Sequence, residues 1–340
     1  MSGPQARQDI NQVLVEVSRG DLVESGHRGA FVVVREDGSV IRSSGDIDRP
    51  FFPRSSLKFI HALPLIETGA ADRFGLDAVE IALAAASHSG DAMHIERIAS
   101  WLFRLGIGEQ ALLCGPHAPF SERAAAQLAR QGRAPGSLHN NNSGKHAAFL
   151  TTARHLGESL DGYLEPMHPV QLRLKSAVER VTGAKLNPTP QGLERCGMPM
   201  YAISLRELAV GMARFGFGTD LEPDLAVAAQ RITSAVSAHP DYVTGARRLP
   251  SLVCTATQGR VVVKGGSEGS YAGFLRHERI ALSLKIDDGA SRAADVLLLD
   301  LLGSLGVEEV RSDPGLQARA RQAVNTAAGQ LAGYVSACNP

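Results

Sequence analysis

Two residues near the start of a predicted helix at 55–69 could carry out acyl transfer. Ser55 and Lys58 are three positions apart, and residues at this spacing lie on one face of a helix. A lysine that is desolvated or close to another cation holds a neutral amine, which can accept the serine proton as the hydroxyl attacks a carbonyl carbon. Taken alone, the same spacing is also typical of a helix-capping serine followed by a solvated lysine.

Two further segments offer partners for this pair. Residues 87–91 read Ser-His-Ser-Gly-Asp and follow a predicted helix at 78–86, so Ser87 could enter a cleft as a nucleophile or proton relay. A helix-capping loop has the same composition. Lys264 ends a predicted strand at 260–264, and two glycines follow it. Small residues there would let a substrate approach the backbone beside a cation, although a hairpin turn alone would also explain them.

A polar run leads directly into another predicted helix at 143–155. Residues 139–146 read His-Asn-Asn-Asn-Ser-Gly-Lys-His, and their amide and backbone groups are suited to holding a carboxylate or a side-chain amide. The alternative is a long exposed turn. A charged run at 284–292, which contains Asp287 and Asp288, is interpreted in the same two ways, as a site or as a strand-to-helix turn.

The elements that must position these residues fall into three stretches of the chain. A β-branched run at 31–34 and an Asp-Gly turn at 37–38 predict a β-hairpin over 30–44. Apolar periodicity predicts mostly helices in the middle of the chain. Strand-like runs at 260–264, 270–275 and 280–286 then precede a helix at 293–305 and a last strand at 331–336. The remaining helices are expected at 95–105, 121–131, 170–181, 205–214 and 225–236.

This order predicts an α+β fold, in which the N- and C-terminal segments form one sheet that helices flank and an α-rich region is inserted between them. We expect a single catalytic unit over 1–340, with a sheet subregion at about 10–50 and 255–340 and an α-rich subregion at about 55–250. No linker rich in proline or serine divides it, and we find no internal repeat.

Composition excludes several classes of protein. With 44% hydrophobic and 21% charged residues, the chain is neither disordered nor fibrous. Its 35 basic and 35 acidic residues cancel, so no global field favours nucleic acid or an anionic membrane, and the expected partner is a small molecule. No apolar run reaches the length of a membrane span, about 18 residues.

The compartment is expected to be the cytoplasm. Residues 1–11 are polar, and Glu16 interrupts the apolar stretch at 13–17, so we find no signal peptide. The four cysteines are far apart in sequence and lack the paired spacing of a zinc ribbon or a disulfide scaffold, so we expect them to be reduced: Cys114, Cys196, Cys254 and Cys338.

Together and in this order, the motifs resemble the rhizobial-type L-asparaginase II family, the inducible, thermolabile class. The likeness extends over almost the whole chain. Besides the segments named above, it includes residues 15–20, 23–25, His27, Cys196-Gly197, Glu268-Gly269 and 285–289. The coincidence of several ordered motifs is much more specific than any one of them.

This resemblance implies a serine-β-lactamase/glutaminase-like fold, a homodimer, and hydrolysis of L-asparagine to L-aspartate and ammonia. It implies two Ser-Lys pairs in one site, Ser55 with Lys58 and Ser87 with Lys264. We expect Ser55 to be the nucleophile and Lys58 its base, although the sequence leaves open which serine attacks. Repulsion among the neighbouring cations would lower a lysine pKa. The residues that the resemblance places at the substrate are Arg54, Asn141, Asn142, Lys145 and Glu194.

The chain departs from the family pattern at one position that bears on metal binding. The family commonly has a cysteine where this chain has Asn142, and there it forms a metal site with the lysine and a second cysteine. Lys145 and Cys196 remain as weak candidate ligands, but loss of a thiolate removes the softest one. We therefore expect no required cofactor and no tightly bound zinc. Glu194-Arg195 also replaces an acidic residue followed by glycine, which could change substrate selectivity.

Two other functions stay open from the sequence. One is a β-lactamase-like or peptidase-like serine acyl hydrolase, against which the lack of a secretion signal counts. The other is a non-catalytic amino-acid-binding protein of the same fold, which the departure at Asn142 makes conceivable. Ammonia release from asparagine separates the enzyme from the binding protein.

Overall fold

Strands from both ends of the chain build one antiparallel sheet in a computed structural model that describes residues 11–338. The sheet order is β6-β7-β8-β2-β1-β10-β9, and β3 pairs with β2 outside this path. The strands are β1 (Val13–Arg19), β2 (Leu22–Arg35), β3 (Val40–Ser44), β6 (Val261–Gly266), β7 (Ser270–Leu275), β8 (Ile280–Ile286), β9 (Arg321–Asn325) and β10 (Leu331–Ala337).

The long strand β2 joins the two parts of this sheet. Its first half pairs with β1, and its second half pairs with β8 and β3. Successive side chains of a strand point to opposite faces, so Phe31 and Val33 enter one core while Val32 and Val34 enter the other. β2 therefore has buried apolar side chains on both faces.

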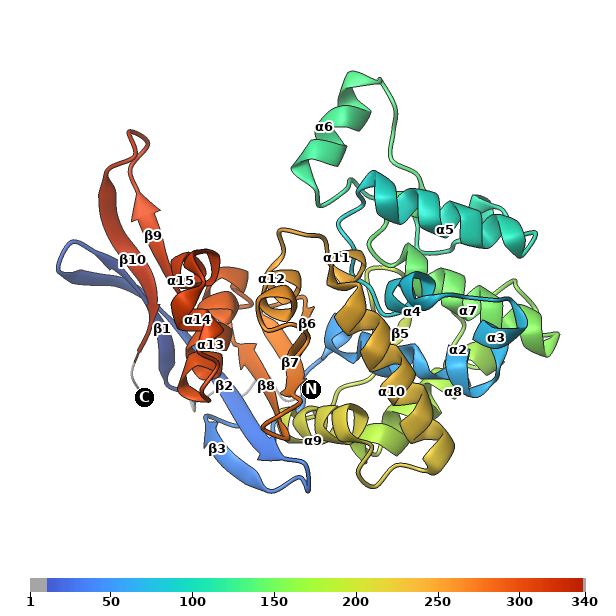
Figure 1. Ribbon diagram of the computed structural model, residues 1–340, viewed down its shortest axis with the longest axis horizontal. Helices are drawn as coiled ribbons and strands as arrows, with labels where there is room; N and C mark the ends of the chain where they lie inside the picture. The colour runs from blue at the N-terminus through green and yellow to red at the C-terminus, as the bar shows by residue number, and fades with distance from the viewer. Residues whose placement is uncertain (1–10, 339–340) are drawn as a thin grey trace, which may run out of the picture.

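Helices cover both faces of the sheet. On one face α13 (Ser291–Ser304), α14 (Glu309–Ser312) and α15 (Pro314–Ala320) form a layer with β1, β8 and β10. On the other face α9 (Leu205–Phe217) packs on β2, β7 and β8 and begins the α-rich part of the molecule (Figure 1). The sheet thus lies between two layers of helices.

The middle of the chain forms the α-rich part, which lies to the right in Figure 1. The predicted α+β architecture, with a sheet built from both ends of the chain and helices inserted between, is confirmed. Besides α9, its helices are α1 (Lys58–His61), α2 (Leu63–Glu67), α3 (Ala70–Arg73), α4 (Ala78–Ala84), α5 (Ala92–Arg104), α6 (Glu122–Arg130), α7 (Ser143–Leu156), α8 (Pro169–Thr182), α10 (Pro223–Ala238) and α11 (Pro240–Val243). The helix that follows, α12 (Leu249–Ala256), packs on β6 and α15 beside the sheet.

The predicted hairpin at 30–44 is confirmed, and Gly38 takes the positive φ that its turn requires. The single helix predicted over 55–69 is wrong, because that segment is divided into the 3-10 helix η1 (Arg54–Leu57), α1 and α2. Pro64, at the start of α2, lacks the N–H that would continue the hydrogen bonding of α1. The break leaves Ser55 in the tight turn η1 and Lys58 at the first position of α1.

Some elements have no counterpart in the sequence prediction. The hairpin of β4 (Gly192–Leu193) and β5 (Pro199–Met200) is too short to produce a periodic pattern. The strand β9 alternates exposed and half-buried residues, so it lacks the apolar signal of a core strand. Residues 1–10, where most of the polar N-terminal segment falls, lie outside the described residues.

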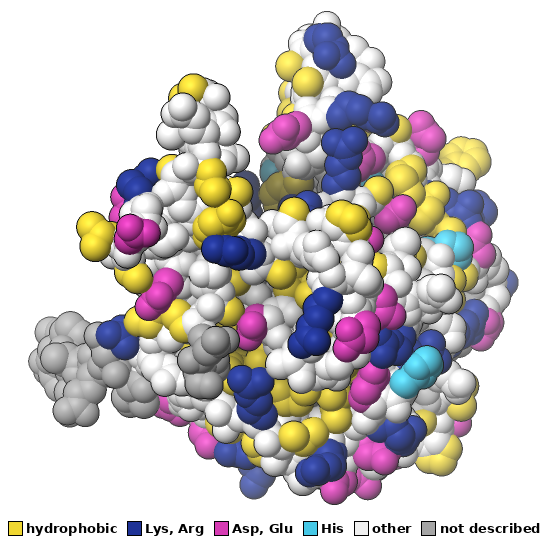
Figure 2. Space-filling model, turned by 60° about the vertical axis from the view of Figure 1, so that its left-hand side comes forward, with side chains coloured by type: hydrophobic (Ala, Val, Ile, Leu, Met, Phe, Trp, Pro, Cys, Tyr) yellow, Lys and Arg dark blue, Asp and Glu magenta, His cyan; other side chains and the backbone are white. Residues whose placement is uncertain are grey.

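The surface and the cysteines agree with the neutral composition and the reduced state. Figure 2 shows acidic and basic side chains interspersed on the face in view, as expected for a chain with a formal net charge of zero. All four cysteines are free thiols. Within 11–338, no helix is long and apolar enough to cross a membrane.

Candidate active site

Three segments that are far apart in sequence meet beside the edge strand β6. They are η1 with Ser55, the residues after α4 with Ser87, and β6 itself with Lys264. Gly266 makes the contact between η1 and β6 possible, because a Cβ there would lie 2.7 Å from both the Pro53 oxygen and Ser56 Oγ. Gly266 therefore allows η1 to pack closely on this strand.

Backbone strain marks the residue before Ser55. Arg54 has a φ of 51°, in the left-handed region that L residues with a side chain rarely adopt. Such strain costs free energy, on the order of 1–3 kcal/mol, and persists where surrounding structure enforces it, often at functional sites. Here it bends the chain into η1 so that Ser55 lines a cavity.

Ser87 lies between two lysine amines. Lys58 Nζ donates to Ser87 Oγ at 2.9 Å, and Lys264 Nζ donates to the same oxygen at 2.8 Å. Each amine also donates to a backbone carbonyl, Lys58 to Ala86 at 2.5 Å and Lys264 to Gly265 at 3.0 Å. Both lysines are therefore directed at one hydroxyl, whereas the Ser55 hydroxyl has no hydrogen bond within the described part of the chain.

The surroundings of these amines favour their neutral form. Both lysine side chains are fully buried. Burial, together with Lys145 and Lys264, lowers the pKa of Lys58 well below its ordinary value. Burial and the nearby Arg248 lower the pKa of Lys264 to about 7. At neutral pH the site therefore contains amines that can accept a proton.

A cavity of about 610 Å³ opens in front of these groups. Ser55, Ser87, Lys264 and Asn141 all contribute to its wall, so the structure brings both candidate serines and one lysine to a single space. The volume falls within the range of small-molecule sites, about 300–1,000 Å³. The cavity continues past the turn between β6 and β7 to α12, α13 and α15, where its wall is formed by Arg247, Arg248, Leu249, Pro250, Ser291, Ala294, Asp295 and Arg319.

A third buried lysine lies close by in a different environment. Lys145 Nζ is 2.9 Å from Glu194 Oε2 and 3.5 Å from both Cys196 Sγ and Met198 Sδ. Burial acts to lower the pKa of Lys145, but Cys196 and Glu194 outweigh burial and hold this pKa above its ordinary value. Burial acts to raise the pKa of Glu194, but Lys145 and Lys58 hold it well below the ordinary value. Lys145 and Glu194 therefore form a charged pair. Lys145 does not line the large cavity.

The residues around Lys145 do not fit a zinc ion. A protonated amine that donates to Glu194 has no lone pair for a metal, and the Cys196 thiol donates to the same carboxylate at 3.3 Å. Within residues 11–338, no group of three or more His, Cys, Asp or Glu side chains could hold a metal ion. With Asn142 in place of a cysteine, we derive no step through a metal.

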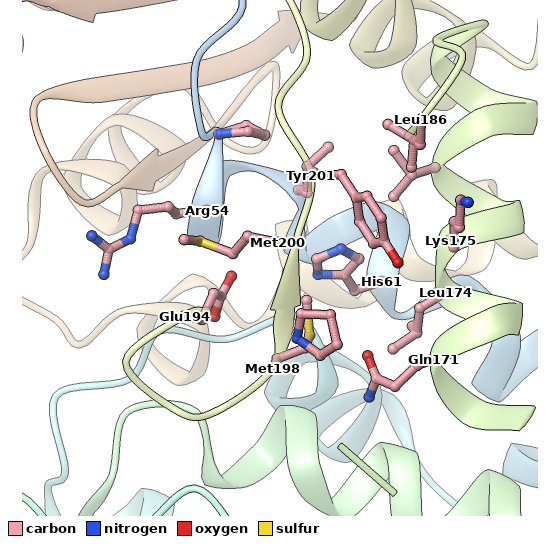
Figure 3. A pocket seen from close by; sticks show the side chains of 14 residues that line it. Arg54, His61, Gln171, Leu174, Lys175, Leu186, Glu194, Met198, Met200 and Tyr201 are labelled. Carbon is pink, nitrogen blue, oxygen red and sulfur yellow. The ribbon is translucent and has the colours of Figure 1, made fainter. Parts of the chain in front are cut away.

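A smaller cavity, of about 30 Å³, lies on the other side of η1. Arg54 and Glu194, two of the residues expected at the substrate, contribute to its wall. Figure 3 shows them on one side of this cavity, opposite Lys175 of α8. This small cavity therefore has a cation and an anion at its wall, whereas Ser55 lines the large cavity.

Most of the polar run at 139–146 holds its own loop. Asn140 Nδ2 donates to the carbonyls of Cys114 and Gly115, both at 2.8 Å, and Asn142 Nδ2 donates to Asn140 Oδ1 at 3.0 Å. Asn141 lines the large cavity. Asn142 Oδ1 is buried and has no hydrogen-bond partner within the described residues, so its oxygen remains available to a donor.

Two features of the site differ from, or go beyond, the sequence analysis. The two Ser-Lys pairs are not separate, because Lys58 donates to Ser87 instead of Ser55 and both lysines therefore share one serine. The sequence analysis also missed the arginines of the large cavity, although Arg247-Arg248 is visible as an adjacent pair. In the charged run at 284–292, Asp288 accepts from Ala290 N at 2.9 Å and pairs with His27, which agrees with the interpretation as a turn.

Residues 15–337 match the family model described as L-asparaginase II. No curated protein matches the chain.

Similar solved structures include one titled "Crystal Structure Analysis of Mglu", at 14% identity over 87% of this chain and 71% of that chain, with a TM-score of 0.46. A β-lactamase (Mb2281c) from Mycobacterium bovis has 13% identity, covers 81% and 94% of the two chains and has a TM-score of 0.39. A putative β-lactamase from Bacteroides dorei DSM 17855 has 13% identity, covers 76% and 84%, and has a TM-score of 0.39.

Proposed function

Because the chain belongs to the L-asparaginase II family, which makes it an amidohydrolase at the family level, we propose that it hydrolyses L-asparagine to L-aspartate and ammonia. The observation that carries the proposal is the position of Ser87 Oγ, within 2.9 Å of two buried lysine amines at the wall of a cavity that Ser55 also lines. Such an arrangement suits serine acyl transfer with lysine as the base.

The proposed reaction has two steps that balance in atoms and protons. Ser55 Oγ bonds to the side-chain amide carbon of the substrate while its proton passes to Lys58, directly or through Ser87. The proton then passes from Lys58 through Ser87 to the neutral amine of Lys264, which protonates the leaving nitrogen as the C–N bond breaks, and ammonia departs. Water next attacks the resulting ester and regenerates the serine, with the same lysines removing and returning a proton.

The acyl half of the substrate is proposed to lie toward Arg54 and Glu194. The guanidinium group would bind the α-carboxylate, and the carboxylate would bind the α-ammonium. Asn142 supplies a buried oxygen that lacks a partner within residues 11–338, and Asn141 supplies an amide at the large cavity. In this arrangement Lys145 acts indirectly, since it holds the Glu194 carboxylate in its charged form.

Ser87 is a second candidate for the nucleophile, and a specific contact favours it. Its hydroxyl oxygen is hydrogen-bonded to both lysines, whereas the Ser55 hydroxyl has no such bond within the described residues. A neutral amine at either position could accept the Ser87 proton directly. Both serines line the large cavity, and the strained backbone before Ser55 favours Ser55 instead.

Ammonia release from L-asparagine, L-glutamine and D-asparagine, together with the colour change when the β-lactam ring of nitrocefin opens, tests the function. We expect turnover of L-asparagine by the wild type, and we expect Ser55→Ala and Ser87→Ala to lose it with unchanged melting temperatures. Acid quenching during turnover followed by mass spectrometry of peptides identifies the nucleophile, because the acyl mass stays on the attacking serine. Hydrolysis of nitrocefin alone would favour the β-lactamase-like alternative, and binding of asparagine without ammonia release would favour the non-catalytic one.

The compartment and the assembly remain predictions from the sequence and its resemblance. A homodimer could use the exposed apolar side chains Leu22 (76% exposed) and Leu331 (56% exposed), which lie at ends of β2 and β10. Sedimentation of the purified chain tests the dimer, and fractionation of the source cell tests the cytoplasmic location.

A further inference from the structure

The large cavity extends well beyond the serine and lysine groups. It reaches three arginines that no step of the proposed reaction uses, Arg247 and Arg248 before α12 and Arg319 on α15. A volume of about 610 Å³ is suited to a ligand of drug size, and free asparagine is much smaller. The space and the charge both indicate that the cavity accepts more than the side-chain amide of one amino acid.

Asp295 is a nearby counter-charge for Arg248 and Arg319 but pairs directly with neither. Within residues 11–338, none of the three arginines forms an ion pair. Their contacts are of other kinds: Arg319 Nη2 donates to the Arg247 carbonyl at 3.0 Å, and the Arg248 guanidinium lies 5.7 Å from the Phe120 ring centroid. Guanidinium groups without carboxylate partners at a concave wall are suited to binding an anion, because they donate to both oxygens of a carboxylate.

The acidic residues of the cavity do not cancel this charge. Asp295 accepts a hydrogen bond from the Tyr271 hydroxyl at 2.7 Å, and burial raises the pKa of its carboxyl. Glu268 is exposed in the turn between β6 and β7, within 2.6 Å of where a Cβ on Gly289 would lie. The wall near α12 and α15 therefore keeps an excess of positive charge.

The position of this wall relative to Lys264 defines which half of a substrate it would contact. Arg248 is close enough to Lys264 to lower its pKa, so the arginines lie on the Lys264 side of the site. Arg54 and Glu194 contribute to a different cavity, on the other side of η1. If the acyl half occupies the Arg54 side, the leaving amine must point toward Lys264 and on toward the arginines.

We propose that Arg247, Arg248 and Arg319 bind a carboxylate carried by the leaving amine, so that the protein hydrolyses secondary amides such as β-aspartyl dipeptides more efficiently than free asparagine. This inference rests on the proposed function and names the substrate class of the same site. The reaction keeps the same balance: the serine oxygen bonds to the β-carbonyl carbon, the C–N bond breaks, and the amine of the second amino acid leaves with a proton from the Lys264 side. Water then releases aspartate.

The test compares three substrates that differ only beyond the amide. They are L-asparagine, β-L-aspartyl-L-alanine, and the C-terminal amide of that dipeptide, which lacks the negative charge. Release of alanine or alaninamide is measured by liquid chromatography, and release of ammonia by a coupled assay. We expect kcat/KM to be about tenfold higher for the charged dipeptide than for its neutral amide, the size typical of a charge-assisted hydrogen bond.

Arginine variants test whether the preference for the charged dipeptide comes from this part of the cavity. Arg247→Gln and the double variant Arg247→Gln/Arg319→Gln should abolish the preference for the charged dipeptide and leave kcat/KM for asparagine unchanged. Arg130→Gln, an exposed arginine of α6 outside the cavity, is the matched control and should keep the preference. Arg247→Gln serves alone if the double variant has a lowered melting temperature, because the Arg247 side chain makes no hydrogen bond within the described residues.

The outcomes separate this inference from the proposed function. Ammonia release from asparagine together with equal rates for the two dipeptide forms, or a preference that survives in the double variant, overturns the arginine subsite alone. Lack of hydrolysis of any amide overturns the proposed function. Calorimetric binding of the two dipeptide forms then decides the inference: tighter binding of the charged form, lost in Arg247→Gln, supports it, and equal or no binding contradicts it.

Discussion

Two buried lysine environments lie close together and differ in one respect. Among residues 11–338, Lys58 and Lys264 have no carboxylate partner within hydrogen-bond distance and donate to Ser87, whereas Lys145 donates to Glu194. All three side chains are fully buried. The first two have lowered pKa values, and the third has a raised one.

The comparison shows that burial alone does not define what a lysine can do. Desolvation lowers the pKa of each of the three amines, and a nearby carboxylate or thiol reverses the result only for Lys145. A lysine without a counter-charge is available as a base, and a paired lysine instead fixes the position and charge of its partner. Substitutions that remove either kind of lysine should therefore have opposite signatures.

The largest expected effect is the loss of activity in Lys58→Met. Removing a general base lowers kcat/KM by a factor of about 10²–10⁴, while the melting temperature should stay the same or rise because an unpaired buried amine is replaced by an apolar group. Ammonia release and thermal unfolding measure the two effects, with the exposed Lys185→Met as control. Full activity in Lys58→Met would remove this lysine from the mechanism.

Lys145→Met should instead affect stability. It leaves the Glu194 carboxylate buried without its partner, which should lower the free energy of unfolding by about 3–5 kcal/mol. Urea unfolding of Lys145→Met, with Lys185→Met as control, measures this loss. Adding Glu194→Gln should recover much of it, and a double variant no more stable than Lys145→Met would contradict the ion-pair explanation.

The pH dependence of kcat/KM should report the lowered pKa of Lys264. If neutral Lys264 is required, kcat/KM falls as the pH drops below about 7, because protonation removes the acceptor, and it reaches a plateau above that pH. Arg248→Gln removes a neighbouring cation, so it should raise the Lys264 pKa and move this limb of the profile to higher pH. A limb that stays in place in Arg248→Gln would assign the titration to another group.

The smallest expected effect is that of metal removal. Since Lys145 and Cys196 both donate to Glu194 and Asn142 replaces a thiolate, we expect kcat/KM to be the same with a chelator and with added zinc. Activity lost on chelation and restored by zinc would show that the cluster rearranges to bind the ion.

The sequence predicted the fold better than the contacts within the site. Hydrophobic periodicity places the strands β6, β7 and β8 and the helices α7 to α10 because burial on one or both faces leaves a regular pattern. The prediction of one continuous helix from Ser55 was wrong. The apolar spacing continues through Pro64, but this residue lacks the N–H that would extend the helical hydrogen bonding. The two-residue strands β4 and β5 leave no pattern, although they carry Glu194 and Cys196 between them.

Spacing along the chain could not predict which lysine contacts which serine. The separation of Ser55 and Lys58 fits one face of a helix, but η1 is a 3-10 turn and the Lys58 amine points to Ser87. Three-dimensional proximity likewise determines the arginine wall, because Arg248 and Arg319 are far apart in sequence and meet where α12 packs against α15. Such contacts depend on packing between elements, which a single sequence does not encode in any short pattern.

The bond between Lys264 and Ser87 joins residues 177 positions apart. A ribosome must therefore synthesise more than three quarters of the chain before the amine can reach the hydroxyl. Incomplete translation products and N-terminal fragments that lack β6 contain both serines but cannot form the site. The arrangement of Ser87 and Lys264 can therefore form only after β6 has been synthesised and has joined the sheet.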